Sequence, residues 1–333
     1  MPARRWVAVT ATADFPVALA PVKEALAGVA PVRTVPLPFR PLGRAEEATF
    51  AKKLQGAEGI LLRPGYVTPS LLDQLPALKA VAVHGAGVDQ VDVPACTERG
   101  VLVTNAPGAN ADAVAELALG LMLSLARRIP EAARRVSQER VWGEARHTGR
   151  ELKGKTLGIV GVGQIGARLA RMAAAAGMEV AAFDPALPAA EIRRRGARPL
   201  TLERLLREAD YLSLHAPLIP STHHLIGRKA IARMKKGAFL VNCARGPLVD
   251  ELAVARALRS GRLAGAALDV LEGEPPDPRS PIFGAPNLIL TPHMAGSTVE
   301  ALEAIARTAG EDLARVLSGK LPRFPVNRPK RRR

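Results

Sequence analysis

Residues 161–166 read Gly-Val-Gly-Gln-Ile-Gly, and their surroundings constrain the fold of this chain more than any other feature. The apolar run 156–160 predicts a buried parallel strand before them, and 167–176, rich in Ala, Leu, Arg and Met, predicts a helix after them. A second short strand is expected at 179–183 and ends on Asp184. A glycine-rich turn between a strand and a helix, with an acid after the next strand, is the pattern of a dinucleotide-binding unit.

Each part of this pattern has a physical reason. The first glycine allows a tight turn, the second lets a pyrophosphate approach the backbone, and the third lets helix and strand pack closely. The helix N-terminus attracts the phosphates, and Asp184 would accept hydrogen bonds from the ribose hydroxyls of adenosine. That carboxylate would repel the 2′-phosphate of NADP, and Pro185 rather than a base follows it. We therefore predict NAD as the cofactor, with arginines 193–195 on a solvated helix face.

Length and composition fit a globular protein of two domains. The chain has 333 residues, enough for two ordinary domains, and 48% of them are hydrophobic. Its two cysteines, Cys96 and Cys243, provide no disulfide framework and suit a reducing compartment, so we predict a cytoplasmic protein. Arg4 and Arg5 precede an apolar run that is too short for an export signal. The longest apolar helix, 113–126, is too short to span a bilayer, and we expect no membrane association.

The formal net charge of +16 raises the question of nucleic-acid binding. Aromatic residues make up only 3% of the chain, and no stacking residues alternate with the basic ones. Residues 328–333 carry a cluster of positive charges and are predicted to form a frayed tail. We therefore expect no nucleic-acid partner, but a positive surface field that attracts a small anionic substrate.

Strands and helices alternate along most of the chain, which predicts the α/β class with doubly wound parallel sheets. The expected strands are 6–10, 59–62, 80–83, 101–105, 156–160, 179–183, 212–215, 239–242, 264–270 and 288–291. The expected helices are 17–27, 46–55, 70–75, 113–126, 130–142, 167–176, 202–208, 228–234, 251–259 and 297–317.

If 156–291 forms one sheet with its own helices, the last expected helix, 297–317, is not part of that domain. We expect it to pack against the N-terminal unit. We thus predict a discontinuous substrate domain, 1–104 with 291–333, into which a Rossmann-type NAD domain, 105–290, is inserted. Both lobes would be Rossmann-like or flavodoxin-like. The two crossovers would form a hinge, and the active site would lie in the cleft between the lobes.

Three polar residues follow successive predicted strands after the glycine-rich turn: Arg245, Glu274 and His293. Chemistry in open α/β sheets takes place beyond the carboxyl ends of the strands. Reduction of a 2-keto acid needs a guanidinium to bind the carboxylate and polarise the keto oxygen, and an imidazole to donate a proton. A carboxylate behind the imidazole fixes its tautomer and favours its protonated form. The three residues therefore predict a catalytic site.

Each of these residues also has a structural alternative. Arg245 could be a surface cation, Glu274 a solvated turn acid and His293 a helix cap. Their joint position at three strand ends favours the catalytic interpretation. The sequence predicts no metal site.

Several segments resemble the D-isomer-specific 2-hydroxyacid dehydrogenases, and the similarity covers nearly the whole chain. The most specific are Asn-Cys-Ala-Arg-Gly-Pro-Leu-Val-Asp at 242–250, Ala-Leu-Asp-Val-Leu-Glu-Gly-Glu-Pro at 267–275 and Thr-Pro-His-Met-Ala-Gly at 291–296. Shorter matches are at 85–89, 114–116, 151–156 and 215–218. The resemblance implies that Arg245 binds the substrate, that His293 is the acid/base and that Glu274 is the carboxylate of the relay.

The resemblance also implies which residues contact the cofactor and the substrate. The implied cofactor contacts are Gly161, Gly163, Gln164, Ile165, Gly166, Asp184, His215, Ala216, Pro217, Thr222, Cys243, Ala244, Asp269, His293 and Gly296. The implied substrate contacts are Arg63, His84, Gly85, Ala86, Gly87 and Arg245. The backbone amides of 85–87 would cradle the substrate carboxylate. Gln164 stands where the family frequently has arginine, which removes a cation near the pyrophosphate but no essential amide.

The resemblance leaves the substrate open between two groups. Arg63 stands where phosphoglycerate dehydrogenases have an arginine for the substrate phosphate, although it could instead cap a loop. The chain ends soon after Asn327, and glyoxylate and hydroxypyruvate reductases share that short form. A rival function is an NAD(H)-sensing protein of the corepressor type, which only the basic tail favours. A Rossmann-fold methyltransferase is disfavoured by Asp184 and by the strand-end residues.

The apolar character of the helix 113–126 extends around much of its circumference, more than packing on one sheet face requires. We therefore predict a homodimer with this helix at the centre of a two-fold interface, as the resemblance also implies.

Overall fold

The computed structural model describes residues 5–143 and 147–329. The chain divides into two compact units, Met1–Asn110 with Ser297–Arg333, and Ala111–Gly296. These boundaries fall a short way after the ones expected from the sequence, which follow residues 104 and 290. Among the described residues, no helix combines the length and the apolar character that crossing a membrane requires.

The first unit contains a five-stranded parallel sheet in the order β2-β1-β3-β4-β5. Its strands are β1 (Trp6–Val9), β2 (Val32–Thr34), β3 (Ala57–Leu62), β4 (Ala80–Val83) and β5 (Leu102–Thr104). Its helices are α1 (Leu19–Ala25), α2 (Arg44–Leu54), α3 (Pro69–Asp73), α4 (Val93–Glu98) and α12 (Val299–Leu317). The central strands are short apolar runs that are buried throughout, because helices cover both faces of the sheet.

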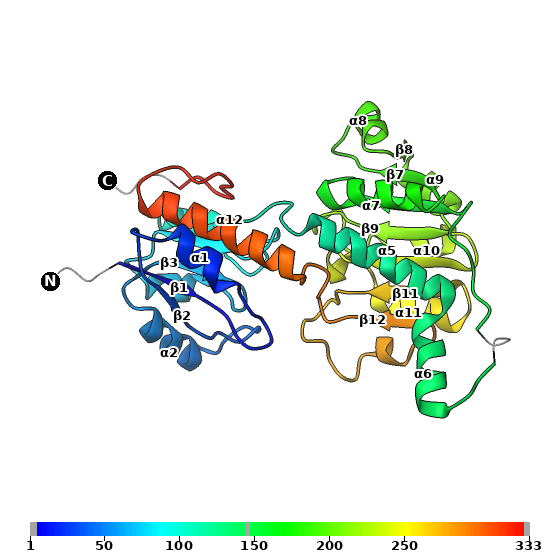
Figure 1. Ribbon diagram of the computed structural model, residues 1–333, viewed down its shortest axis with the longest axis horizontal. Helices are drawn as coiled ribbons and strands as arrows, with labels where there is room; N and C mark the ends of the chain where they lie inside the picture. The colour runs from blue at the N-terminus through cyan, green and yellow to red at the C-terminus, as the bar shows by residue number, and fades with distance from the viewer. Residues whose placement is uncertain (1–4, 144–146, 330–333) are drawn as a thin grey trace. The chain divides into compact units, whose positions relative to one another are not determined.

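Alternate strand residues supply the two cores of this unit. Val7 and Val9 of β1 pack with residues of α1 and α12, whereas Trp6 and Ala8 pack on the opposite face with residues of α2, α3 and α4. Figure 1 shows α1 and α12 lying side by side on this sheet. The helix α12, near the end of the chain, therefore packs in the same unit as β1, the first strand.

The second unit contains a seven-stranded parallel sheet in the order β12-β11-β10-β9-β6-β7-β8. Its strands are β6 (Thr156–Val160), β7 (Glu179–Phe183), β8 (Arg198–Pro199), β9 (Tyr211–Leu214), β10 (Ala238–Asn242), β11 (Leu263–Leu268) and β12 (Leu288–Leu290). Its helices are α5 (Ala111–Arg127), α6 (Ile129–Glu139), α7 (Gln164–Ala175), α8 (Ala189–Arg194), α9 (Leu202–Glu208), α10 (Arg228–Arg233) and α11 (Glu251–Arg259). Helices α5, α7 and α8 contribute to the core on one face, and α9, α10 and α11 to the core on the other.

The strand order of this sheet reverses beside β6. The chain runs outward from β6 to β7 and β8, and then returns to β9 on the other side of β6. Ligands of open α/β sheets bind beyond the carboxyl ends of the strands at such a switch point. The glycine-rich turn directly follows β6, so the topology places it where a dinucleotide is expected.

The predicted fold class, α/β with two parallel sheets, is confirmed. The sequence pattern does not predict the edge strands β2 and β8 or the short helix α4, and it indicates α8 only through the arginines 193–195 that were expected on a helix face. β2 has three residues, none of them buried, and β8 has two residues, one of which is a proline. Elements that bury so little apolar surface lack the periodicity from which strands and helices are predicted.

Candidate active site

Two of the three loop glycines are required by the packing of the turn between β6 and α7. Gly161 has a φ of +89°, and a Cβ there would lie 2.7 Å from the carbonyl oxygen of His215. A Cβ on Gly166 would lie 2.2 Å from the carbonyl oxygen of Gly161. Beyond its chain neighbours, no described atom lies within 4 Å of the place that a Cβ on Gly163 would occupy. The second glycine therefore leaves open space beside the backbone, as the approach of a pyrophosphate requires.

The start of α7 offers hydrogen-bond donors and positive charge to a diphosphate. Its N-cap, Gly163, has no side chain to bond the first amides of the helix, so these N–H groups face outward. Arg168 donates to Gln164 Oε1 at 3.0 Å, which places a guanidinium one turn along the helix. A hollow of about 310 Å³ beside the turn is lined by Gly163, Gln164, Ala167, Arg168, Arg171, Arg194, Arg195 and Gly196. The residues present fit a dinucleotide, although Gln164 itself is neutral.

The Asp184 carboxylate is bonded to the backbone of this loop. Its Oδ2 accepts from the Val162 amide at 2.9 Å and its Oδ1 from the Ala186 amide at 3.0 Å. Arg195 donates to the Val162 carbonyl at 2.6 Å and pairs with Glu191. The expectation that arginines 193–195 all lie on a solvated helix face is thus wrong for Arg195, because the fold turns its side chain toward the glycine-rich loop.

The loop after β9 lies against the same turn. His215 is partly buried, its Nε2 lies 2.8 Å from Ser213 Oγ, and its Nδ1 has no partner among the described residues. Burial lowers the pKa of His215 to about 4, so the ring is neutral near neutrality. Thr222 Oγ1 donates to the Pro217 carbonyl at 2.8 Å and accepts from the Ile219 amide at 2.9 Å. This hydroxyl closes the 217–222 turn.

The proposed acid/base pair is formed in the second unit. His293 Nδ1 lies 2.6 Å from Glu274 Oε2, and Glu274 Oε1 accepts from the Leu271 amide at 3.2 Å. The Leu271 amide therefore fixes the Glu274 carboxylate, and this carboxylate in turn fixes the orientation of the imidazole. The His293 side chain is 46% exposed, so its ring remains accessible. Nε2 is consequently the nitrogen that can exchange a proton with a ligand.

Asp269 organises the loop that carries this histidine. Its carboxylate accepts from Thr291 Oγ1 at 2.6 Å and from the amides of Met294 and Ala295, each at 2.9 Å. Its carbonyl accepts from the His293 amide at 2.7 Å. His293 has a φ of +52°, a left-handed conformation that costs energy in a non-glycine residue and is maintained by these bonds. Asp269 is predicted from the sequence only as a cofactor contact. No pattern in the sequence indicates that its carboxylate positions the loop of His293.

Arg245 lies in the loop after β10, which packs closely against the loop after β11. A Cβ on Gly246 would lie 1.9 Å from the carbonyl oxygen of Leu271, so only glycine fits there. Asn242 fixes the backbone before the arginine, because its Nδ2 donates to the Arg245 carbonyl at 2.8 Å and its Oδ1 accepts from the Ala244 amide at 3.0 Å. The arginine is thereby placed beside the loop that carries Glu274.

The other predicted cofactor contacts of this unit also lie at the carboxyl ends of strands or in the first turn of α7. Ile165 is in that turn, Ala216 and Pro217 follow β9, and Ala244 follows β10. Gly296 is the last residue of the unit. Cys243 is buried beside Asp269, which together with burial raises the pKa of its thiol. Its thiol is therefore protonated and unreactive near neutral pH.

The predicted substrate residues other than Arg245 lie in the first unit, where Arg63 and His84 contact each other. Arg63 Nη1 lies 3.0 Å from His84 Nδ1, and Nη2 donates to Ser297 Oγ at 3.4 Å. Burial and the neighbouring guanidinium lower the pKa of His84 to about 3. The ring is thus neutral and accepts from Arg63 at Nδ1, which leaves the hydrogen on Nε2. That atom is buried and unpartnered among the described residues.

The glycine loop 85–87 follows β4 directly. The Ala106 amide donates to the Gly85 carbonyl at 2.8 Å, and Asn105 Nδ2 donates to the Ala86 carbonyl at 2.6 Å. These two bonds occupy carbonyl groups, but the Gly85 amide also donates, to the Val83 carbonyl at 2.9 Å, so the expectation that all three amides of 85–87 are free for a carboxylate is wrong for Gly85. Thr10 Oγ1 in turn accepts from the Arg63 amide at 2.9 Å. Asn105, Thr10 and Ser297 are therefore supporting residues that the sequence does not single out, since the partners are far apart along the chain.

A glycine-rich turn at the switch point of a parallel sheet, followed by a histidine–carboxylate pair at the strand ends, defines a dinucleotide-binding α/β protein. Residues 119–295 match the family model described as "D-isomer specific 2-hydroxyacid dehydrogenase, NAD binding domain". The chain belongs to the D-isomer specific 2-hydroxyacid dehydrogenase family, and its second unit contains the NAD-binding domain.

Relatives and solved structures agree with this assignment. The chain is 41% identical over 296 residues to the D-3-phosphoglycerate dehydrogenase of Methanocaldococcus jannaschii, covering 86% of this chain and 56% of that protein. It is 40% identical over 273 residues to the glyoxylate reductase of Thermofilum pendens, covering 79% and 78%. The crystal structure of the TT0316 protein from Thermus thermophilus is similar with a TM-score of 0.84 and 37% identity, covering 97% of this chain and all of that one. The chain thus spans little more than half the length of its phosphoglycerate dehydrogenase relative.

Proposed function

We propose that the protein is an NAD-dependent dehydrogenase that interconverts a D-2-hydroxy acid and its 2-keto acid by hydride transfer. The observation that carries the proposal is the His293–Glu274 pair, with Nδ1 and Oε2 2.6 Å apart, on the NAD-binding unit of a 2-hydroxyacid dehydrogenase family member. An NAD(H)-sensing protein could retain the same residues, so turnover of a keto acid is the observation that distinguishes the two functions.

The mechanism assigns one task to each strand-end residue. When bound, the nicotinamide cofactor supplies or accepts the hydride. His293 donates a proton from Nε2 to the keto oxygen during reduction and takes it back during oxidation. Glu274 orients the ring and stabilises the imidazolium, because it bonds Nδ1 at 2.6 Å. Arg245 binds the substrate carboxylate through two parallel hydrogen bonds and polarises the keto oxygen.

We further propose that the substrate is a small anionic acid with a polar group beyond its carboxylate. The amides of Ala86 and Gly87 bind its carboxylate, and Arg63 with His84 binds the distal group. The Arg63 guanidinium, held beside the His84 ring, suits a phosphate or hydroxyl oxygen. The candidates are 3-phosphoglycerate, or glyoxylate and hydroxypyruvate. Glyoxylate has no polar group beyond its carboxylate and the carbonyl that is reduced, so its turnover would leave the Arg63–His84 pair without a role. Relatives of this chain are named D-3-phosphoglycerate dehydrogenase and glyoxylate reductase.

We also propose a cytoplasmic homodimer. The cytoplasmic location is supported by Cys96 and Cys243, both of which are free thiols. The dimer is supported by apolar side chains that stay exposed on α5 and α6, including Leu123 and Val136. The basic tail on which the corepressor-type alternative depends lies mostly outside the described residues.

The test is a steady-state screen of keto acids with purified protein, monitored by the absorbance of the reduced cofactor. Glyoxylate, hydroxypyruvate, 3-phosphohydroxypyruvate and pyruvate are compared with both NADH and NADPH. We expect turnover of at least one compound, preference for NADH, and loss of turnover in His293→Ala. NADH binding without turnover of any of these acids, at levels equal to His293→Ala, would overturn the proposed activity and favour a sensing function.

A further inference from the structure

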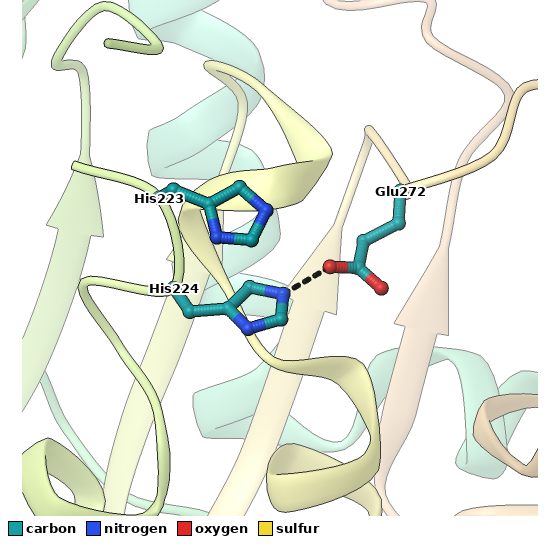
Figure 2. Close-up of side chains that lie close together, drawn as sticks. All are labelled: His223, His224 and Glu272. Carbon is teal, nitrogen blue, oxygen red and sulfur yellow. Dashed lines mark hydrogen bonds and ion pairs between the residues drawn. The ribbon is translucent and has the colours of Figure 1, made fainter. Parts of the chain in front are cut away.

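Three metal-ligating side chains meet outside the proposed active site. His223 and His224 lie in the loop between β9 and α10, and Glu272 lies in the loop after β11. Figure 2 shows both imidazoles on the same side of their loop, facing the carboxylate of Glu272. One ligand atom from each residue lies within 4.8 Å of the others, and all three residues are exposed. The chain brings these groups together only by folding, since 48 positions separate His224 from Glu272.

The backbone on both sides of the cluster is fixed. His224 has a φ of +49°, and its amide donates to the Pro247 carbonyl at 2.8 Å. Its Nε2 is hydrogen-bonded to Glu272 Oε1, and its ring stacks on that of His223 with centroids 4.1 Å apart. The Glu272 amide donates to Glu251 Oε1 at 2.6 Å. The ligands are therefore largely positioned before any ion arrives, which lowers the entropic cost of binding.

The donor set and the charge suit a divalent transition metal. Two imidazoles and one carboxylate are a ligand set that Zn²⁺ uses when a fourth position is left to solvent. The adjacent Glu251 carboxylate adds negative charge to the site. Ligand atoms about 2.1 Å from a tetrahedral ion are about 3.4 Å apart, so the exposed side chains must move together by roughly an ångström.

We propose that His223, His224 and Glu272 bind one divalent transition-metal ion of the zinc class, with the remaining coordination supplied by water. The ion joins the loop after β9 to the loop after β11. Glu272 is two positions before Glu274, so a bound ion fixes the segment that leads to the proposed relay carboxylate. The site itself does not depend on the proposed activity, because it uses none of the residues assigned to cofactor or substrate.

The test uses tag-free full-length protein that has been treated with a chelator and dialysed. Co²⁺ is added as a spectroscopic probe, and the appearance of its visible ligand-field bands is followed to saturation. Zn²⁺ is then used to displace Co²⁺, and calorimetry gives the stoichiometry. We expect one ion per chain and bands that indicate nitrogen ligation.

Variants separate this cluster from other possible ligands. His224→Gln and Glu272→Gln should each weaken Zn²⁺ binding by at least on the order of tenfold, since even indirect partners of a metal change affinity by that much. His147→Gln, His293→Gln and the exposed Glu203→Gln serve as controls and should bind as the parent does. Circular dichroism of each variant establishes that it is folded.

Two outcomes would overturn the proposal. One is the absence of stoichiometric Co²⁺ or Zn²⁺ binding by the folded parent protein, in which case the cluster is only a hydrogen-bonded pair beside a stacked ring. The other is binding that survives His224→Gln and Glu272→Gln but disappears in His293→Gln, which would place the ion at the proposed acid/base pair.

Discussion

The His293–Glu274 pair concentrates the proposed chemistry in two side chains. Glu274 is held by the Leu271 amide, and His293 by the carbonyl of Asp269. The imidazole can therefore turn little, and its free nitrogen stays directed away from the carboxylate. Because the proton donor is already oriented, the protein does not have to rearrange as the transition state forms.

Replacing each member of this pair should have a different kinetic effect. His293→Ala should lower kcat for keto-acid reduction on the order of 10²–10⁴-fold, the usual loss for a missing general acid. Glu274→Gln removes the carboxylate that fixes the imidazole, so kcat should fall, but less than in His293→Ala. Both variants should still bind NADH, as measured by fluorescence titration. A His293→Ala enzyme with normal kcat and an unchanged pH profile would show that the proton comes from elsewhere.

Two histidines, the buried His84 and the partly buried His215, should make stability depend on pH. The pKa falls from 6.5 to about 3 for His84 and to about 4 for His215, mainly through burial. Between these values and 6.5 the unfolded chain binds more protons than the folded one, so stability is full above pH 6.5 and decreases as the pH falls. Each proton contributes a slope of up to about 1.4 kcal/mol per pH unit.

Urea unfolding at pH 7 and pH 5 measures this dependence. His84→Gln and His215→Gln should each lose less stability over that interval than the parent protein, whereas the exposed His223→Gln should behave like the parent. Equal losses in all four proteins would mean that neither His84 nor His215 contributes.

At the scale of elements, the turn between β6 and α7 combines two kinds of glycine. Gly166 is required by the contact of the helix with its own loop, because a Cβ there would lie 2.2 Å from a carbonyl oxygen. Gly163 borders open space and has a φ of −72°, which any residue can adopt. Gly166 is thus needed for the packing of the fold, whereas Gly163 leaves room for the ligand.

This difference gives a paired prediction. Gly166→Ala should lower the thermal unfolding temperature clearly, because backbone atoms would have to move. Gly163→Ala should unfold at nearly the parent temperature but bind NADH at least on the order of tenfold more weakly, since a methyl group enters the space of the pyrophosphate. Calorimetric scanning and NADH titration measure the two effects. Equal effects of both substitutions on unfolding and on binding would contradict the assignment.

Sequence patterns predicted those helices and strands that bury enough apolar surface for their apolar residues to recur at regular spacing. They indicated β6, β7 and the glycine turn because these depend on neighbouring residues. They missed β2, which has no buried residue, and they gave no indication that Arg63 reaches Ser297 across 234 positions. The positioning function of Asp269 was also missed, since its carboxylate acts on residues beyond the next strand. Contacts between distant segments depend on the fold, which local patterns do not contain.

At the scale of the whole molecule, the exposed apolar side chains of the second unit suggest self-association. Ile129 and Val136 of α6 are 50% and 42% exposed, and Trp142 is 90% exposed. The described part of α6 has no buried residue, so packing within the chain does not account for its apolar positions. Burying them against a second copy by two-fold symmetry would remove this surface from water.

Light scattering coupled to size-exclusion chromatography should give the mass of a dimer at micromolar concentration. The double variant Val136→Glu, Trp142→Arg should shift the protein toward the monomer. Leu321→Glu, which changes an apolar side chain that is 77% exposed in the other unit, is the matched control and should remain dimeric. A monomeric parent protein would refute the prediction.

The order in which the two units can form follows from the path of the chain. The second unit is continuous, whereas the first contains both ends, and α12 covers its sheet. Asn327 also accepts from the Val103 amide at 2.8 Å and donates to the Val101 carbonyl at 3.0 Å. During synthesis on the ribosome, the sheet of the first unit can therefore be covered only after α12 and Asn327 have emerged, when the whole of the inserted unit has already been made.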